Sequence, residues 1–470
     1  MNVDRREVTM LRRVLCTVGV AAVVCGCSDP TGVTIAAPAE LPPPMGWNSW
    51  NSGIEVDDKS IRETADAMVS SGMKGVGYEY VNVDAGWSAH ERNSDGELVP
   101  DPLRFPFGLK PLVDYVHARG LRFGLYSSPF NQTCGQGVGT ASLGHEAQDA
   151  ATFAAWGVDF LKYDWCGTDA SHDQQVEVFG TMGSALRHSG RRIVYSINPN
   201  SSRDPTAGVR FDWSGIADMV RTSGDLVPLW HLSFPVPDGV DPLALAVFNG
   251  VPEQFATAAA ATAKGDYRSD PDMLVVGVTW SQFFLHFREL LRHSERTQTL
   301  TAAQRAMVEP MLAMPEQTVK QIADAGPSLT DDEQRSHFSL WAMLGAPLLA
   351  GNDLRTMSPV TREILTNREV IAVDQDPMMA KARQVGRDGR VWAKRLADST
   401  VAVALFNPSS APADVTTTAA AAGLPSAPCY ALRDLWSGGS TTTVGAIVAK
   451  SLPSHAVRLV RVFVSRADVA

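Results

Sequence analysis

Short apolar runs alternate with amphipathic stretches from about residue 43 to residue 360, and this alternation limits the fold more than any other feature. The runs at 79–84, 122–126, 159–164 and 192–197 are typical of buried strands. Apolar residues also recur at helical spacing, and a glycine follows each such stretch where a helix would end: Ile61, Ala65, Met68 and Val69 before Gly72, and Leu109, Leu112, Val113 and Val116 before Gly120. Strand–helix alternation over this length predicts parallel βα units, most simply a (β/α)8 TIM barrel over residues 43–377.

Polar or aromatic residues stand at or just past the ends of the predicted strands. They are Trp50, Asp84, Tyr126, Asp164, Asn198, Asp225 and Asp272. A single aspartate in such a place is more often a helix cap than a functional group. Seven residues at successive strand ends favour an active site, because these ends form one face of a barrel.

The pattern of apolar and turn-forming residues changes after about residue 378. Residues 391–394, 401–406 and 456–460 alternate or run apolar between turns rich in Gly, Ser, Pro and Thr. This pattern predicts a C-terminal antiparallel β-sandwich over 378–465. No motif in it indicates chemistry, so a packing role is favoured over an ancillary sugar-binding role.

The N-terminal segment, residues 1–27, is typical of an export signal. Arg12 and Arg13 precede an uncharged run that is too short to span a bilayer. The run ends Cys25-Gly26-Cys27, which resembles a bacterial lipoprotein processing site with Cys27 as the lipidated residue; a plain secretory signal is the alternative. Residues 28–42 are expected to form a tether. The sequence thus predicts an exported protein, either secreted or periplasmic, or one that a lipid anchor alone attaches to a membrane.

Charge and short motifs exclude several classes of function. The chain has 41 Lys and Arg residues against 51 Asp and Glu residues, so it lacks the basic surplus that nucleic-acid phosphates require. Zinc-binding patterns are absent, and neither a metal nor a cofactor is predicted. A serine-hydrolase elbow and a phosphate-binding loop are absent as well. In an oxidising compartment Cys134 and Cys166 are candidates for pairing.

A series of motifs over about 43–465 resembles the α-galactosidases of glycoside hydrolase family 27, in the order of that family. The motifs are Met45–Asn51 (Met-Gly-Trp-Asn-Ser-Trp-Asn), Tyr80–Asp84, Ser142–Glu146, Gly157–Asp164, Arg221–Asp225, Asp270–Leu274, Ser336–Trp341, Ala346–Leu349, Val373–Asp376, Trp392–Lys394 and Arg433–Trp436. The resemblance implies a retaining α-glycosidase that acts on an oligo- or polysaccharide, most simply by releasing terminal α-D-galactosyl residues.

The resemblance also implies roles for individual residues. Asp164 would be the nucleophile and Asp225 the general acid/base, the pair of carboxylates that retention requires. Lys162 alternates with the nucleophile along one strand and so points to the same side. Substrate-binding residues would be Trp50, Asp84, Tyr126, Lys162, Asn198 and Arg221. A disulfide between Cys134 and Cys166 would bracket the pocket beside the nucleophile.

Two departures from the family bear on the substrate. The family usually carries two successive acids that hold the O4 and O6 hydroxyls, whereas this chain has Asp84-Ala85; Asn198 stands where the family often has a glutamate. The same chemistry on another sugar therefore stays open, as in isomalto-dextranases that act on α-1,6-glucan or in β-L-arabinopyranosidases. A third hypothesis is a sugar-binding lipoprotein without catalytic activity. The presence of both Asp164 and Asp225 argues against it.

A further departure is an insertion at about 281–330, where the family has a short helix. Its segments 283–292 and 302–325 are expected to be helical. Since the insertion leaves near the end of the seventh strand, it is either a surface decoration or a lid that shapes subsites for an oligosaccharide.

Overall fold

The computed structural model describes residues 42–134, 140–165, 170–201, 204–232, 248–261, 266–296, 309, 312–325 and 328–465. The predicted signal at 1–27 with its Cys27, all but the last residue of the predicted tether, and Cys166 lie outside these ranges. Within them, no helix has the length and apolar character needed to cross a membrane.

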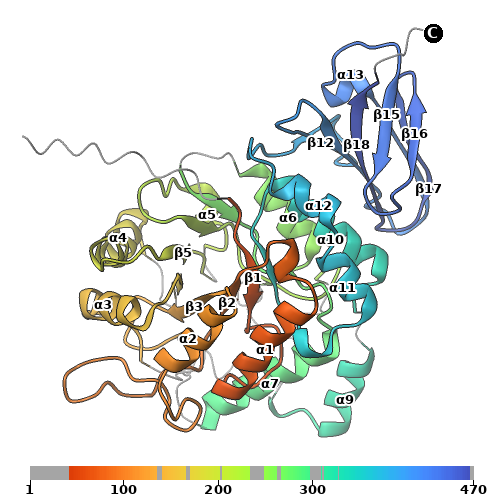
Figure 1. The fold of residues 1–470 in the computed structure, drawn as a ribbon. Helices are drawn as coiled ribbons and strands as arrows, with labels where there is room; N and C mark the ends of the chain where they lie inside the picture. The colour runs from red at the N-terminus through yellow and green to blue at the C-terminus, as the bar shows by residue number, and fades with distance from the viewer. Residues whose placement is uncertain are drawn as a thin grey trace, which may run out of the picture. The chain divides into compact units, whose positions relative to one another are not determined.

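Eight parallel strands form the central sheet, in the order β10-β1-β2-β3-β4-β5-β6-β9 (Figure 1). Their bounds are β1 Met45–Asn48, β2 Tyr80–Asn82, β3 Arg122–Ser127, β4 Phe160–Asp164, β5 Val194–Asn198, β6 Met219–Arg221, β9 Arg268–Asp270 and β10 Leu348–Ala350. Leu274 closes the ring from β9 to β10, because its N–H donates to Leu349 O (2.7 Å) and its carbonyl accepts from Gly351 N (2.9 Å). The expected (β/α)8 barrel is confirmed.

Helices follow the strands around this barrel. They are α1 Asp58–Ser70, α2 Lys110–Ala118, α3 Glu146–Trp156, α4 His172–His188, α5 Ala207–Arg210, α6 Val251–Ala260, α7 Trp280–Arg296, α9 Glu316–Ala325, α10 Asp331–Leu344, α11 Pro359–Leu365 and α12 Arg368–Asp374, with short 3-10 turns at Lys74–Val76 and Leu354–Thr356. Local chemistry sets their ends. The Asp57 side chain accepts from Ser60 N at the start of α1, and Thr330 and Glu333 form a reciprocal capping box on α10.

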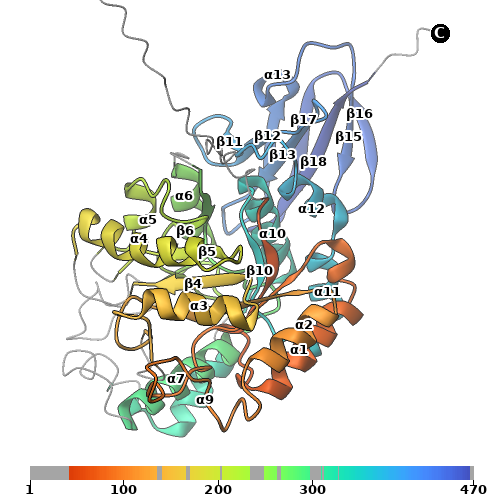
Figure 2. The same ribbon diagram turned by 60° about the vertical axis from the view of Figure 1, so that its left-hand side comes forward.

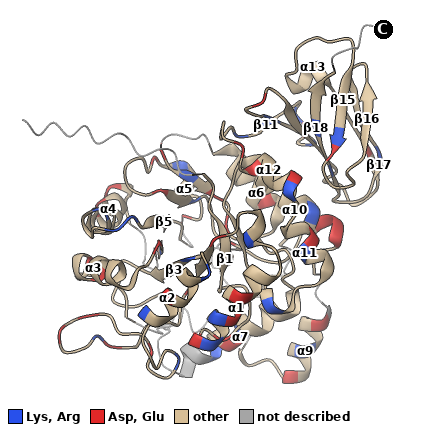
Figure 3. Cartoon of the chain, viewed as in Figure 1, with Lys and Arg blue, Asp and Glu red and all other residues tan. Residues whose placement is uncertain are grey.

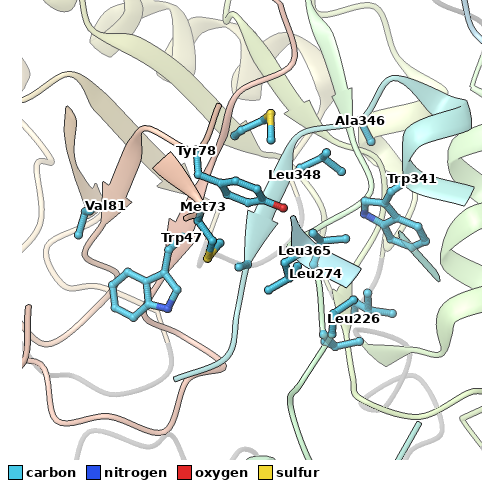
Figure 4. Close-up of a cluster of buried hydrophobic side chains, with 14 of the residues drawn as sticks. Trp47, Met73, Tyr78, Val81, Leu226, Leu274, Trp341, Ala346, Leu348 and Leu365 are labelled. Atoms are coloured by element: carbon cyan, nitrogen blue, oxygen red, sulfur yellow. The ribbon is translucent and has the colours of Figure 1, made fainter. Parts of the chain in front are cut away.

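The barrel core is continuous from the strands to the surrounding helices. Figure 4 shows Trp47 of β1, Leu274 beside β9 and Trp341 of α10 in one cluster of buried side chains. The two indole N–H groups are not left unpaired, since Trp47 Nε1 donates to Asn352 O (2.8 Å) and Trp341 Nε1 to Asp272 O (2.9 Å). Both bonds tie core side chains to the backbone just past the strand ends, and so they fix the loops at the mouth of the barrel.

The helices of the insertion pack against each other and against the loop that follows β6. α7 and α9 lie side by side in both ribbon views (Figure 2). Trp280 and Phe284 of α7 and Val319 of α9 share a buried apolar cluster with Val227 and Leu229. α7 agrees with the helix expected at 283–292. The helix expected at 302–325 is confirmed only at its end, in α9: residues 302–308 and 310–311 lie outside the described ones, and the chain is not helical at 313–315, because Pro315 disfavours a helical residue before it.

The C-terminal region forms the expected antiparallel sandwich. A six-stranded sheet has the order β11-β12-β13-β18-β15-β16 and a second sheet pairs β14 with β17. The bounds are β11 Arg383–Gln384, β12 Val391–Arg395, β13 Val401–Phe406, β14 Ala413–Thr418, β15 Tyr430–Asp434, β16 Ser440–Thr443, β17 Ala446–Leu452 and β18 Val457–Val464, with the helical turn α13 at Ala419–Ala422. Hydrogen bonds join it to α10: Ser336 Oγ donates to His455 O (2.6 Å), and Trp436 Nε1 donates to Ser339 Oγ (2.9 Å).

Charged residues of both signs are interspersed on the outer helices (Figure 3). On α1, Arg62 pairs with Asp58 one turn earlier (2.7 Å). The helices labelled α1, α9, α10 and α11 each carry both acidic and basic residues. This distribution agrees with the slight acidic surplus of the sequence, and these four helices carry no basic stripe.

Candidate active site

Three charged side chains meet at the C-terminal ends of β2 and β4. Lys162 Nζ lies 2.8 Å from Asp84 Oδ2 and 3.3 Å from Asp164 Oδ2. Asp84 follows β2 by two residues, and it also accepts from Asn48 Nδ2 at the end of β1 (3.0 Å). Strand alternation places Lys162 and Asp164 on the same side of β4. The structure therefore brings three of the predicted site residues into one network inside the mouth of the barrel.

Burial sets the electrostatics of this network. Asp164 is 9% exposed, and its burial raises its pKa to about 6, against the opposing charge of Lys162. The charges of Asp84 and Asp225 raise the same pKa further, whereas Arg221 lowers it. Burial opposes the charge of Lys162, but Asp164 and Asp84 raise its pKa well above the ordinary value. At neutral pH Asp164 is therefore an anion beside a fixed cation.

A second charged group follows β6 and β9. Arg221 is buried, and its guanidinium contacts Asp225 Oδ1 (3.0 Å) through Nη2 and Asp272 Oδ1 (3.0 Å) through Nη1. Nη2 also donates to Gly224 O (2.7 Å). Although burial opposes its charge, the carboxylates of Asp272 and Asp225 raise the pKa of Arg221. Asp272 is held in turn, since its Oδ2 accepts from Leu226 N (2.8 Å). Arg221 thus fixes the loop that carries Asp225.

The two candidate catalytic carboxylates differ in their access to solvent. The side chain of Asp225 is 40% exposed, whereas that of Asp164 is 12% exposed. A nucleophile profits from burial between fixed charges, because its anion then needs no solvent reorganisation. An acid/base has to exchange a proton with a leaving group and then with water. This difference in exposure is the one expected if Asp164 is the nucleophile and Asp225 the acid/base.

The remaining predicted residues surround this centre in different ways. Asn198 ends β5 directly opposite Asp164 in the strand register, and its Oδ1 accepts from Asn200 Nδ2 (2.9 Å). Tyr126 is buried in β3 with Lys162 Nζ 5.2 Å from its ring centroid, and its hydroxyl accepts from Cys134 N (3.2 Å). Cys166, the predicted disulfide partner of Cys134, lies outside the described residues.

Sequence reasoning did not name several residues that order the site. Asn48 holds Asp84, and Asn200 Nδ2 donates to Arg221 O and Ser223 O (3.0 Å each). Asp272 stands at a strand end without a predicted role, and it has a left-handed backbone with φ of 79°, which is uncommon for a residue other than glycine. A usable signal was present for Asn48, which lies inside the Trp-Asn-Ser-Trp motif.

A pocket of about 390 Å³ adjoins the centre on the side of β1 and β2. Its lining includes Trp50, Ala85 and Gly86 from the loops after these strands, together with His286, Glu289 and Leu290 of α7. Trp50 therefore lies in this pocket, next to the position where a second acid was missing. The residues that the structure describes include no group of three or more His, Cys, Asp or Glu side chains arranged to hold a metal ion.

Two family models match the chain. A model described as alpha galactosidase A matches residues 42–285 and 315–376. A model described as alpha galactosidase C-terminal beta sandwich domain matches residues 386–462. The first match leaves out residues 286–314, which contain the end of α7.

Curated proteins and solved structures give the same relationship. An α-galactosidase of Cyamopsis tetragonoloba is 36% identical over 420 residues, which cover 89% of this chain and 85% of the relative. Alpha-galactosidase A of Cellvibrio japonicus is 35% identical over 370 residues, 78% of this chain and 76% of the relative. The crystal structure of α-galactosidase I from Mortierella vinacea superimposes with a TM-score of 0.73 at 32% identity, and covers 91% of this chain and 99% of the other.

Proposed function

This chain belongs to the family 27 α-galactosidases and is a glycosidase, and we propose that it hydrolyses α-D-galactosides through Asp164 and Asp225 with retention of configuration. The observation that carries the proposal is the pair of unlike aspartates at one barrel mouth: Asp164 is buried against Lys162 (3.3 Å), and Asp225 is half-exposed on Arg221 (3.0 Å).

The reaction has two displacements. In the first, an oxygen of Asp164 bonds to the anomeric carbon while the bond to the leaving oxygen breaks, and Asp225 gives its proton to that oxygen. In the second, Asp225 takes a proton from water, the water oxygen bonds to the anomeric carbon, and the bond to Asp164 breaks. The products are the free sugar and the alcohol, and both aspartates return to their starting protonation states.

The surrounding residues position the sugar and the two acids. Lys162 keeps Asp164 ionised and offers its remaining N–H donors to hydroxyls, while Asp84 accepts from them. The Nε of Arg221 is buried without a hydrogen-bond partner among the described residues, while Nη2 holds Asp225 in place (3.0 Å). Tyr126 and Asn198 complete the walls of the site.

The proposal is tested with purified enzyme and an aryl α-D-galactoside. We expect hydrolysis, and a loss of at least about 1000-fold in kcat/KM for Asp164→Asn, since removal of a nucleophile leaves only binding and electrostatic effects. Asp332→Asn is the matched control, because Asp332 lies in the first turn of α10 and its side chain is 50% exposed. An Asp164→Asn enzyme with wild-type activity would contradict the proposal, as would a wild type inert on the galactoside.

A second candidate substrate is an α-1,6-glucan, and one observation favours it. Ala85 lines an open pocket where an acid at this position would lie next to Asp84. Loss of a hydrogen-bonding group weakens discrimination between sugars that differ in one hydroxyl. A panel of aryl α-galactoside, α-1,6-glucan and aryl β-L-arabinopyranoside ranks the candidates by kcat/KM, and preference for either of the last two would replace galactose as the substrate.

We also propose that the protein is exported and anchored by a lipid on Cys27, on the evidence of the sequence at 12–27. The Cys27→Ser variant is expected to leave the membrane fraction, whereas a wild type found in the medium with another first residue would refute the anchor. We propose in addition that Cys134 pairs with Cys166, and peptide mapping that finds either thiol free in the exported protein would refute that pairing.

A further inference from the structure

One part of the wall of the pocket beside Ala85 comes from a segment that the family model does not match. His286, Glu289 and Leu290 line it from α7, and the family match stops at residue 285 and resumes at 315. The loops after β1 and β2 supply Trp50 and Ala85 on the opposite wall. A segment outside the family match therefore contributes to the pocket next to the proposed active site.

α7 is held firmly enough to form such a wall. Trp280 and Phe284 in its first half pack in the apolar cluster described above. The guanidinium of Arg288 is buried and contacts Glu316 of α9 at 3.2 Å. Since Glu316 also pairs with Arg292, two successive turns of α7 are tied to α9. The positions of His286 and Glu289 are therefore fixed between anchored turns.

A short chain of contacts joins the pocket to the nucleophile. Ala85 N donates to Asp84 Oδ1 (2.9 Å), and Asp84 N donates to Ser49 Oγ, another lining residue (2.9 Å). Asp84 shares Lys162 with Asp164. These contacts connect the pocket to the ion pair that holds the candidate nucleophile.

The barrel order decides which end of the sugar faces the pocket. Asp225, which serves the leaving group, follows β6, whereas the pocket lies at β1 and β2, and three strands separate β6 from β2 in the ring. In a pyranose, C4 and the C6 arm lie across the ring from C1. A sugar with C1 at Asp164 and its leaving oxygen toward Asp225 turns that far end toward Asp84 and the pocket.

We propose that this pocket is a second sugar subsite, which holds a neutral pyranose joined to the far end of the reacting sugar, with His286 and Glu289 as its hydrogen-bonding groups. The inference rests on the proposed function. It extends that function from terminal galactosyl residues to substrates whose reacting sugar carries a further unit, from which the enzyme releases a disaccharide.

The lining suits a neutral sugar. The volume of the pocket, about 390 Å³, falls in the range of about 300–1,000 Å³ typical of small-ligand pockets. Trp50 offers an apolar ring face with a polar edge. Burial lowers the pKa of His286, so at neutral pH its ring has one donor and one acceptor, which match hydroxyl groups. Glu289, whose Oε2 lies 3.8 Å from Arg292 Nη1, adds a carboxylate that accepts from hydroxyl groups.

The test compares products from a tetrasaccharide that has two successive α-1,6-linked galactosyl units at its non-reducing end. We expect the wild type to release a digalactoside as well as galactose, as seen by chromatography of early time points. In Glu289→Gln and in His286→Ala the ratio of digalactoside to galactose should fall about tenfold. Asp324→Asn is the matched control, because this acid lies on α9, pairs with Lys320 and does not line the pocket.

The outcomes separate this inference from the proposed function. If the wild type hydrolyses the aryl α-galactoside but releases only galactose from the tetrasaccharide, the subsite is refuted and the activity stands. If the product ratio is the same in both pocket variants as in the control, the subsite is refuted too. If α-galactosides are inert while an α-1,6-glucan yields a disaccharide, the sugar in the proposed function is wrong and the subsite is supported. Should Glu289→Gln fail to fold, His286→Ala decides.

Discussion

Replacement of Lys162 by methionine is expected to move the acid limb of the pH–rate profile. Lys162 Nζ lies 3.3 Å from Asp164 Oδ2, and at an effective dielectric constant of about 20 a pair at this distance attracts by about 5 kcal/mol. That energy corresponds to about three to four pKa units. Methionine keeps most of the side-chain volume and removes the charge, so the pKa of Asp164 should rise above its present value of about 6.

Water that enters the space left by the ammonium group will solvate the Asp164 carboxylate and reduce the shift. We therefore expect the pKa of Asp164 to rise by at least about two units. The acid limb of kcat/KM reports ionisation in the free enzyme. With a nucleophile pKa at about 8 in place of about 6, the ionised fraction at pH 7 falls about tenfold, and activity recovers as pH rises.

The assay is kcat/KM for an aryl α-galactoside across pH 4–9, with thermal unfolding as a check on folding. Lys381→Met is the matched control, because Lys381 is a partly buried lysine that donates to Ser269 Oγ (2.9 Å). An acid limb that stays near pH 6 in a folded Lys162→Met enzyme would refute the role given to the ion pair.

Two further predictions concern stability. Asp164→Asn should stabilise the fold by about 3 kcal/mol at pH 7, because a carboxyl whose folded pKa of about 6 exceeds its unfolded value loses stability as pH rises through that window; unfolding in urea at pH 4 and pH 7 should show the gain only at pH 7. Gly208→Ala should lower the free energy of unfolding by about 1–3 kcal/mol and displace Arg221, since a Cβ there would lie 1.7 Å from Arg221 O. The control Gly180→Ala, with its nearest atom 3.9 Å away, should be neutral or stabilising. Equal Tm values for both glycine variants would contradict the packing argument.

The sequence was informative about the barrel because its signals are local. A buried strand such as 160–164 is a short segment in which aromatic and aliphatic residues predominate, and a helix such as 58–70 has a cap at Asp57 and a glycine at position 72. These features need no knowledge of distant residues. For the same reason the strand-end positions of Asp84, Asp164 and Asn198 followed from the pattern alone.

Contacts between residues far apart in the sequence could not be predicted from these local patterns. The closure of the ring through Leu274 and the fork of Arg221 between Asp225 and Asp272 depend on which loops meet, and no local spacing encodes that. The sequence predicts that the insertion is helical, but it does not decide between a surface decoration and a lid that shapes subsites. Only the contact of α7 with the pocket beside Ala85 favours subsite formation over surface decoration.

The most direct test of the central claim, retention through Asp164 with Asp225 as acid/base, is the configuration of the product that azide forms with an Asp225→Ala enzyme. Without its base, this enzyme should accumulate the glycosyl-enzyme from an activated aryl α-galactoside, and azide should attack from the side that water normally takes. NMR of the product should therefore show the α-galactosyl azide, with the configuration of the substrate retained. A β-galactosyl azide would mean that the roles of the two aspartates are reversed, and an Asp225→Ala enzyme with unchanged activity and no azide product would contradict the assignment of the site.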